Sequence, residues 1–176
     1  MSDKRYETDR IYIRRITPQD TDLIVDWRNR EDVREHFFFR EPFTRQMHEK
    51  WLTEKVLTGE VEQFIVCLKD GDRPIGSSYL RDIDGDAGSA EYGIFIGEAD
   101  ARGIGLGYDI LCATMDFAIN DLGLNTIRAR AISSNMASIH IFEKYGFVRD
   151  ELIRNVTCSD ASIVDMVMLS YKATKG

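Results

Sequence analysis

Residues 90–107 read AEYGIFIGEADARGIGLG and run directly into a long apolar segment. The first seven residues favour a strand, an acidic turn follows, and a helix opens with Arg102, Gly103, Ile104, Gly105, Leu106 and Gly107. Because glycine has no Cβ atom, several backbone N–H groups can converge on phosphate oxygens at the positive end of this helix, and Arg102 adds a full positive charge. This arrangement predicts a cofactor that carries a diphosphate.

The spacing of these glycines excludes two common nucleotide motifs. A dinucleotide fingerprint that starts at Gly103 needs glycine where Tyr108 stands, and one that starts at Gly105 needs glycine where Ile110 stands. The Gly-Lys-Ser/Thr end of a triphosphate-binding loop occurs nowhere in the chain. What remains is Arg-x-x-Gly-x-Gly between a strand and a helix. A glycine-rich helix entry chosen only for close packing is the alternative interpretation.

Two motifs together resemble the GNAT superfamily of N-acetyltransferases. The pattern from Arg102 to Gly107 resembles the acyl-CoA pyrophosphate motif of that family. Residues 135–147, which read NMASIHIFEKYGF, resemble the signature in which Asn, followed by Ala or Ser, leads to Glu-Lys-x-Gly-Phe at the end of a helix. The two motifs stand in the right order, with one helix and one strand between them.

The N-terminal third resembles one branch of this superfamily. Ile13-Arg14-Arg15, Trp27-Arg28-Asn29 and residues 48–51 are similar to the branch that contains ribosomal-protein N-terminal acetyltransferases, spermidine acetyltransferases and the acetyltransferases of nucleotide-linked amino sugars. The matches span nearly the whole chain. We therefore expect residues 1–176 to form a single GNAT domain that uses acetyl-CoA.

Hydrophobic period and turn chemistry predict the element order β-α-α-β-β-β-α-β-α-β-β. The expected fold class is α/β (α+β), of the GNAT-type acyl-CoA N-acyltransferase fold, with a mixed, mostly antiparallel sheet of about seven strands and helices on both faces. The second helix is predicted from about Arg45 to Leu57. A closing antiparallel pair is predicted over residues 147–156 and 163–171.

The 176 residues carry a net charge of −7, and 43% of them are hydrophobic, which suits one domain with a substantial core. No run of lysine and arginine predicts a nucleic-acid surface. An acidic chain suits an amine substrate, although solubility accounts for the same charge. Three cysteines without Cys-x-x-Cys spacing, no signal-peptide pattern and no apolar run of eighteen residues predict a cytoplasmic protein that does not enter membranes.

The resemblance implies where the cofactor lies. The two central strands are expected to splay apart, so that the pantetheine arm pairs with backbone near Phe95 and Ile96. An N–H group at the splay, that of Ile94 or Phe95, would stabilise the oxyanion of a tetrahedral intermediate. Asn135 faces the cofactor in similar enzymes, and it is also a plain helix N-cap.

Candidate catalytic groups follow from the same resemblance. Glu91 is the expected general base, because similar enzymes often have a glutamate here on the cofactor strand; a solvent-facing carboxylate is the alternative. Many GNAT enzymes have a tyrosine that protonates the leaving sulfur, but here that position is Phe142, which is counted among the cofactor contacts and cannot donate a proton. Tyr145, Ser138 or a water molecule could serve instead, or the thiolate leaves unassisted.

Aromatic and basic residues of the N-terminal third are the candidate acceptor site. Trp27, Arg28, Asn29 and Phe37 are predicted to contact substrate, and the hydrophobic core is the alternative place for the aromatic ones. The three histidines have no carboxylate or cysteine at metal-ligand spacing, so no metal site is expected.

The predicted function is acetyl transfer from acetyl-CoA to a primary amine. Ranked by resemblance, the acceptor is an amino sugar on a nucleotide carrier, then a protein N-terminus, then a polyamine. The alternatives are a non-catalytic acyl-CoA-binding module, which Phe142 motivates, and a protein-interaction domain that kept the fold alone. The expected partner is a small-molecule amine or a protein N-terminus, with no nucleic acid and no membrane, and a homodimer is left open.

Overall fold

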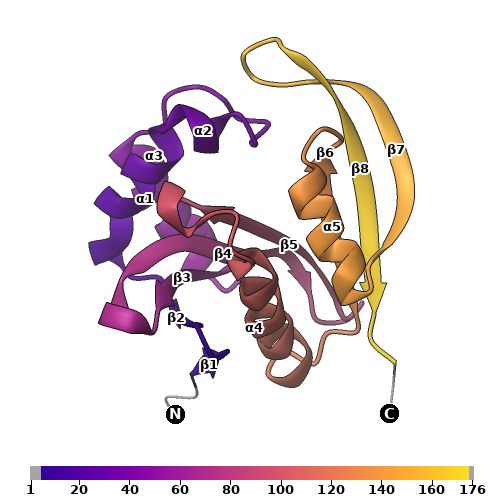
Figure 1. Ribbon diagram of the computed structural model, residues 1–176, viewed down its shortest axis with the longest axis horizontal. Helices are drawn as coiled ribbons and strands as arrows, with labels where there is room; N and C mark the ends of the chain where they lie inside the picture. The colour runs from indigo at the N-terminus through magenta and orange to yellow at the C-terminus, as the bar shows by residue number, and fades with distance from the viewer. Residues whose placement is uncertain (1–4, 175–176) are drawn as a thin grey trace.

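Eight strands form one mixed sheet in the computed structural model, which describes residues 5–174 (Figure 1). Their order is β1-β2-β3-β4-β5-β6-β8-β7, and neighbouring strands are antiparallel except for the parallel pair β5 and β6. The sequence predicted about seven strands. The additional strand is β1 (Tyr6–Glu7), whose two residues are too few to show a period.

The other strands are β2 (Ile11–Arg15), β3 (Glu62–Leu68), β4 (Pro74–Asp84), β5 (Ser89–Ile96), β6 (Thr126–Ile132), β7 (Val148–Thr157) and β8 (Ile163–Lys172). The helices are α1 (Thr21–Asn29), α2 (Glu31–Arg34), α3 (Arg45–Trp51), α4 (Leu106–Asn120) and α5 (Met136–Tyr145). The predicted order of elements is confirmed, with β1 and the single turn of α2 added to it.

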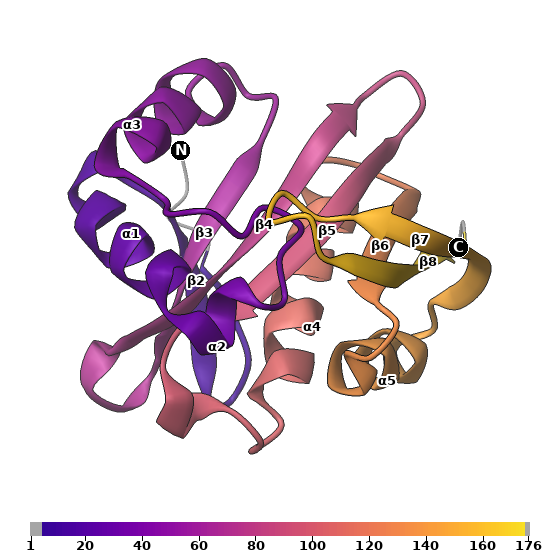
Figure 2. The ribbon, with the colours of Figure 1, turned by 90° about the horizontal axis from the view of Figure 1, so that it is seen from above.

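The N-terminal helices cover one face of the sheet. Along β2, Tyr12 packs with Ile24 and Trp27 of α1, while its neighbours Ile11 and Ile13 belong to the core on the opposite face. This alternation is the two-residue period of a strand that is buried on both sides. The helices α1, α2 and α3 therefore form one layer, which Figure 2 shows gathered over β2 and β3.

The second helix has the predicted extent, but its winding changes along its length. Thr44 accepts a hydrogen bond from the Met47 amide at 3.2 Å, which caps the start of α3. After Trp51 the helix widens into π-type turns over residues 52–56, where the Leu57 amide donates to the carbonyl oxygen of Leu52 at 2.8 Å. A hydrophobic period cannot distinguish this wider winding from an ordinary helix end.

The helices α4 and α5 cover the other face and pack against each other. A Cβ atom on Gly107 would lie 2.7 Å from the Cδ1 atom of Ile141, so the bare glycine lets the Ile141 side chain pack closely against α4. Gly107 therefore serves helix packing as well as the loop that precedes it.

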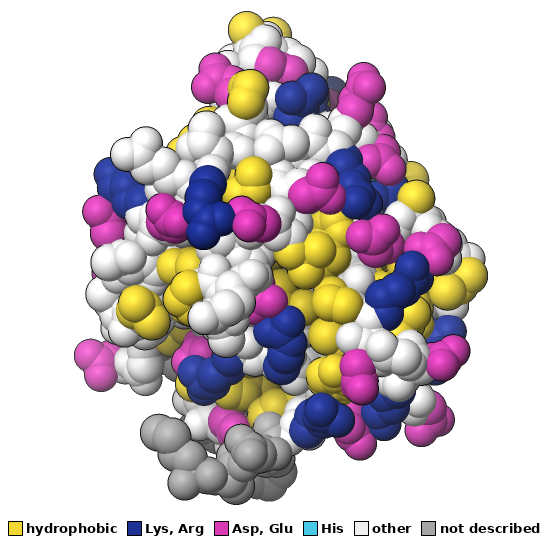
Figure 3. All heavy atoms as spheres, turned by 90° about the vertical axis from the view of Figure 1, so that its left-hand side faces the viewer, with side chains coloured by type: hydrophobic (Ala, Val, Ile, Leu, Met, Phe, Trp, Pro, Cys, Tyr) yellow, Lys and Arg dark blue, Asp and Glu magenta, His cyan; other side chains and the backbone are white. Residues whose placement is uncertain are grey.

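Charges of both signs are interspersed on the face of the molecule shown in Figure 3, with hydrophobic side chains visible between them. On the helical layer, for example, Arg45 pairs with Asp22 and Glu49. Among the described residues, no helix has both the length and the apolar character needed to cross a lipid bilayer.

Candidate active site

A wedge opens in the middle of the sheet, between β5 and β6. The two strands pair in parallel from Ser89 opposite Thr126 to Tyr92 opposite Ala129. Beyond this point β5 continues beside β4 and β6 continues beside β8, so the two strands diverge. The splay that the resemblance implied is confirmed.

The backbone of β5 turns amide groups toward this wedge. The Gly97 amide donates to the carbonyl oxygen of Ile75, next to β5, at 2.8 Å. Hydrogen-bonded and non-bonded pairs alternate along an antiparallel ladder, so the Phe95 amide also faces β4. The amides of Ile94 and Ile96 therefore face the wedge. Of the two amides predicted at the splay, the one available to a ligand is that of Ile94.

The glycine loop before α4 presents bare backbone at a helix N-terminus. Gly103 and Gly105 have φ values of 73° and 84°, in the left-handed region that favours glycine. Gly105 is the N-cap of α4 and has no side chain that could occupy the first N–H groups of the helix. These N–H groups and the helix dipole suit an anion, as the sequence predicted.

Two arginines stabilise this loop, and each already forms an ion pair with a carboxylate. Arg102 donates to two carbonyl oxygens near the end of β5, at 2.9 and 3.2 Å, and pairs with Asp32 at 2.5 Å. Arg10 donates to the carbonyl oxygen of Ile104 at 2.7 Å and pairs with Asp109 at 3.1 Å. Asp32 offsets the charge of Arg102, so Arg102 mainly stabilises the loop. Backbone amides are then the main hydrogen-bond donors that an anion could use.

A groove of about 280 Å³ runs along this loop and into the wedge. Most of the predicted cofactor residues line it: Phe95, Ile96, Arg102, Gly103, Gly105, Leu106, Gly107 and Asn135. Ile104 is 55% exposed and is not among the lining residues, and Phe142 lines the neighbouring cavity instead. The groove therefore joins the N-terminus of α4 to the amides of β5 that face the wedge.

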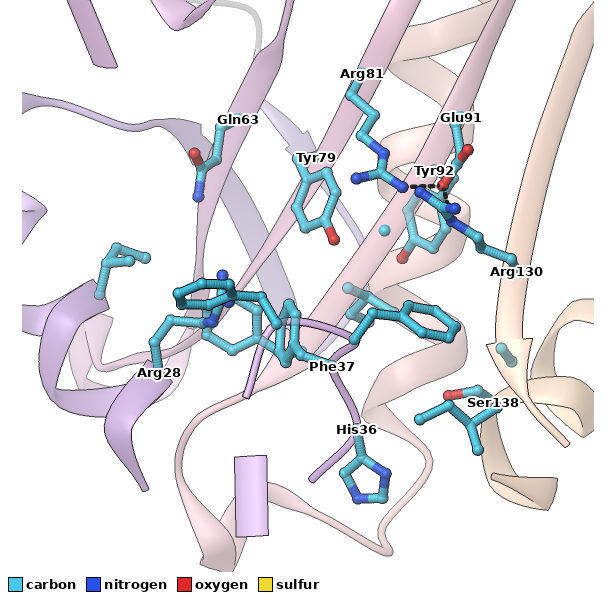
Figure 4. Close-up of a pocket in the computed structure, with 18 of the residues that line it drawn as sticks. Arg28, His36, Phe37, Gln63, Tyr79, Arg81, Glu91, Tyr92, Arg130 and Ser138 are labelled. Carbon is cyan, nitrogen blue, oxygen red and sulfur yellow. Dashed lines mark hydrogen bonds and ion pairs between the residues drawn. The ribbon is translucent and has the colours of Figure 1, made fainter. Parts of the chain in front are cut away.

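A larger cavity of about 520 Å³ adjoins this groove (Figure 4). Its walls come from α1, residues 36–39, α3, the central strands and α5. Five residues line both spaces: His36, Ile94, Phe95, Asn135 and Ser138. The groove and the cavity thus meet beside the wedge, where a molecule in one can reach a molecule in the other.

The cavity is closed on one side by contacts between distant parts of the chain. The tip of the β7–β8 hairpin arches toward the segment that follows α2 (Figure 1). Here the Ser159 amide donates to the Phe38 carbonyl oxygen at 2.9 Å, and the Arg40 amide donates to Ser159 Oγ at 2.7 Å. The Arg40 guanidinium also donates to Ser162 Oγ at 2.9 Å. These hydrogen bonds hold the segment 37–39, which consists of three phenylalanines, against the cavity.

Glu91 is held between two arginines at the edge of the cavity (Figure 4). Its Oε1 atom accepts from Arg81 at 2.5 Å and from Arg130 at 2.8 Å. The Glu91 side chain is only 13% exposed. Burial raises the pKa of this carboxyl above its usual value, although the Arg81 charge and hydrogen bond act in the opposite direction. The predicted base is thus a buried, oriented carboxylate rather than a solvent-facing one.

Arg28 enters the cavity from α1 and is stacked against aromatic rings. Its Cζ atom lies 3.7 Å from the ring centroid of Phe37 and 4.7 Å from that of Phe43. Tyr79 and Gln63 line the same part of the cavity (Figure 4). The predicted substrate residues Arg28 and Phe37 are therefore brought together in one wall.

His48 is buried beside this wall and is neutral at pH 7. Its Nδ1 atom lies 3.0 Å from Thr21 Oγ1. Burial, followed by the nearby charge of Arg28, lowers the pKa of His48 to about 4. His36 also lines the cavity, whereas His140 lies exposed on α5. Within residues 5–174, no group of three or more histidines, cysteines or carboxylates is arranged to hold a metal ion.

The family model of the acetyltransferase (GNAT) domain matches residues 10–148, well over half of the chain. The chain belongs to the GNAT acetyltransferases. Amine acetylation with acetyl-CoA is the chemistry of this family.

Similar proteins agree with this assignment. An uncharacterized N-acetyltransferase p20 from Bacillus licheniformis is 24% identical over 93% of both chains. An aminoglycoside N(6')-acetyltransferase type 1 from Klebsiella pneumoniae is 28% identical over 90% of this chain and 83% of its own. A spermidine N-acetyltransferase from Vibrio cholerae, crystallised with CoA and spermine, superimposes with a TM-score of 0.85 at 19% identity, covering 94% of this chain and 96% of its own. That last likeness shows the fold.

Phe142, which occupies the usual position of the acid, and the two candidate hydroxyls of the acetyltransferase, Tyr145 and Ser138, lie in different surroundings. Phe142 is 3% exposed and packs edge-on against Tyr92, with ring centroids 5.9 Å apart. Tyr145 packs among other rings, lines neither the groove nor the cavity, and burial raises its pKa to about 12. Ser138 lines both spaces, next to the N-cap Asn135, whose Oδ1 atom accepts from the Ser138 amide at 3.3 Å. Of the two candidate hydroxyls, Ser138 is therefore the one at the junction.

Two predicted substrate residues of the acetyltransferase do not reach the cavity. Trp27 is fully buried, and its indole N–H donates to Glu98 at 2.7 Å. The Asn29 side chain bonds to the backbone of Val25 and Phe43, at distances of 2.7 to 2.8 Å, and holds the loop before α3. These two residues are structural supports for the wall that Arg28 and Phe37 form.

Several cavity residues were missed from the sequence, and four polar ones matter most for the site. Arg81 and Arg130 bind Glu91, and Tyr79 and Gln63 line the wall near Arg28. A signal for Arg81 was present, because the β4–β5 hairpin places it directly opposite Glu91. Arg130 comes from β6, across the parallel part of the sheet, where no local turn fixes the register.

Proposed function

We propose that the protein transfers an acetyl group from acetyl-CoA, held in the groove, to a primary amine of a small molecule held in the cavity. The observation that carries this proposal is the junction, where Ile94, Asn135 and Ser138 line both spaces. When bound, acetyl-CoA would supply the acetyl group as an activated thioester. The chain's own residues would bind, orient and exchange protons.

Backbone groups of the groove fit this cofactor. The uncapped first turn of α4 and the left-handed Gly103 and Gly105 would accept the diphosphate. The amides of β5 that face the wedge would pair with the pantetheine arm in the manner of an added strand. The Ile94 amide lies nearest the point where β5 and β6 part, so it is the proposed donor to the developing oxyanion.

Glu91 is the proposed general base. Both arginines bind its Oε1 atom, and no described side chain bonds to Oε2, which leaves that oxygen to accept a proton from the amine through water. A lysine-like amine has a pKa of about 10.4, so only about one molecule in a thousand is neutral at pH 7. Such an acceptor needs a base more than an α-amine with a pKa of about 8 does.

Ser138 is the proposed group that delivers a proton toward the leaving sulfur, directly or through water. Its position at the junction supports this role, and the packing of Tyr145 away from the cavity supports it further. A hydroxyl is a weak acid, so we expect its contribution to be modest.

The test is thiol release from acetyl-CoA across a panel of primary amines, combined with calorimetric binding of CoA. The proposal expects micromolar CoA binding and turnover with at least one class of amine. Tight CoA binding with no turnover on any amine would instead support the acyl-CoA-binding module that Phe142 suggests. Absence of CoA binding would contradict both the acetyltransferase and the acyl-CoA-binding module, and would support a protein-interaction domain that kept only the fold.

We further propose that the protein works in the cytoplasm. Cys67, Cys112 and Cys158 are all free, and Cys67 and Cys158 are buried, which suits a reducing compartment. That residues 1–176 form a single domain and that the protein forms a homodimer remain predictions.

A further inference from the structure

The charged lining of the acceptor cavity is mostly positive. Three arginines line it, namely Arg28, Arg81 and Arg130, and the carboxylate among the lining residues is Glu91. Glu91 is already shared by Arg81 and Arg130. His48 adds no positive charge, because it is neutral at pH 7. The cavity therefore carries an excess of two positive charges before any acceptor enters.

Arg28 has no carboxylate partner within residues 5–174. Its contacts are the faces of Phe37 and Phe43, and its Nε atom is buried without a hydrogen bond to any described residue. Burial lowers the pKa of Arg28, and no carboxylate offsets this effect. Other arginines beside the site, such as Arg102, each have an acidic partner. Arg28 is thus a largely buried cation with no neutralising partner among residues 5–174.

A guanidinium in this position is well suited to an anionic ligand. Burying an unpaired charge is costly, and the cost is recovered only when a partner of opposite charge arrives. The Arg28 Cζ atom lies over the rings of Phe37 and Phe43, and no described residue accepts a hydrogen bond from its guanidinium, which leaves N–H groups for the two oxygens of a carboxylate or phosphate. The aromatic walls also exclude water, which strengthens such a pair.

We propose that the acceptor amine carries an anionic group, a phosphate or a carboxylate, and that Arg28 binds it. This inference rests on the proposed acetyl transfer, because it concerns the molecule that enters the same cavity. Figure 4 shows Arg28 and Ser138 on opposite sides of the cavity. An acceptor whose anion lies at Arg28 therefore has room to extend its amine toward the junction. A polyamine, which is cationic along its whole length, would meet like charge at both ends.

Matched pairs of amines test this specificity. Turnover is measured for phosphoethanolamine against ethanolamine, glucosamine 6-phosphate against glucosamine, and 4-aminobutanoate against butylamine, with spermidine as the cationic comparison. The expected result is a kcat/KM about tenfold or more higher for the anionic member of at least one pair. The pair that shows it identifies phosphate or carboxylate as the preferred group. Equal values within every pair, or a preference for spermidine, would overturn the inference while leaving the acetyltransferase intact.

Substitution of Arg28 tests the residue itself. Arg28→Gln is expected to reduce the anionic preference to about one, mainly through KM, and Arg28→Lys to retain part of it, since lysine keeps the charge but loses the planar fork. Arg34→Gln is the matched control, because Arg34 lies on the neighbouring α2 and lines neither space. CoA binding and the melting temperature of each variant show whether the fold is kept. A preference that survives in Arg28→Gln contradicts the assignment.

Direct binding separates this inference from the failure of catalysis. Calorimetry with phosphoethanolamine and 4-aminobutanoate, in the presence of saturating CoA, needs no turnover. If no amine is acetylated, binding of either probe that is lost in Arg28→Gln still supports an anion site at Arg28. If the wild-type protein binds neither probe and acetylates no anionic amine, the inference fails.

Discussion

The cofactor groove and the acceptor cavity lie side by side, yet they are built in different ways. The groove is lined mostly by one continuous stretch, residues 94–107, and is completed by residues of α2, by His36 and by the start of α5. The cavity is made of side chains from segments as far apart as α1 and α5. The comparison teaches that recognition by backbone can be encoded in a short local motif, whereas recognition by side chains arises only when distant segments have folded together.

The largest expected effect comes from placing a charge in the groove. Two like charges about 4 Å apart repel by about 4 kcal/mol at a surface dielectric of about 20, so Gly105→Asp should weaken CoA binding about a thousandfold. Arg10 lies near this position but is already paired with Asp109. The measurement is the calorimetric Kd of CoA.

Gly123→Asp is the control for this substitution. Gly123 also has a left-handed φ, of 66°, and open space around its Cβ position, but it follows the far end of α4. Both variants carry the same backbone strain, so only Gly105→Asp should lose CoA. Equal losses in the two variants would mean that strain, not the diphosphate, accounts for the result.

The second effect lies at the edge of the cavity. Glu91→Gln should lower kcat by about a hundredfold for amines of pKa near 10, and by much less for α-amines. Because burial raises the pKa of Glu91, wild-type kcat/KM should fall as the pH decreases through that raised value, where the carboxyl becomes protonated. The variant should lack this acidic limb of the pH profile. Identical profiles for both proteins would remove Glu91 from the role of base.

The third effect compares two hydroxyls of α5. Ser138→Ala should lower kcat about tenfold, the value of one hydrogen bond to a charged group, with CoA binding unchanged within about twofold. Tyr145→Phe should change kcat by less than about twofold, because Tyr145 lines neither space. Steady-state rates at saturating acetyl-CoA decide between them, and the opposite ranking would make Tyr145 the acid.

The smallest effect concerns the stability of the acceptor side. The pKa of His48 is about 4 in the folded protein and about 6.5 in the unfolded chain, so below pH 6.5 the unfolded chain binds a proton that the folded one does not. The free energy of unfolding should therefore fall by about 1 kcal/mol for each pH unit between 6.5 and 4. Urea titrations should show a shallower decrease in His48→Gln. The exposed His140→Gln is the control, and the same slope in both variants would contradict the prediction.

These differences explain how much could be predicted from the sequence. The glycine loop depends on neighbouring residues, so the motif from Arg102 to Gly107 placed it correctly, whereas the wedge between β5 and β6 was expected only from the family resemblance. The motif did not show that Asp32, on α2, pairs with Arg102. That contact depends on how α2 packs, and no local pattern contains it.

For the acceptor cavity, residue type alone did not predict which side chains line it. Trp27 and Arg28 are adjacent in sequence, but helical geometry turns one into the core and the other into the cavity. Phe142 and Tyr145, three positions apart on α5, both contact the ring of Phe147, but of these two only Phe142 lines the cavity. Only the packed structure distinguishes such pairs.

The bonds between Ser159 and the segment at Phe38 and Arg40 have a consequence for how the enzyme can change. They connect the last hairpin of the chain to a loop near its beginning, and none of them contacts the glycine loop. A substitution, insertion or deletion at the tip of the β7–β8 hairpin would change the shape of the acceptor cavity without altering the glycine loop. One catalytic frame can thus acquire new amine substrates through a few residues far from the reacting atoms.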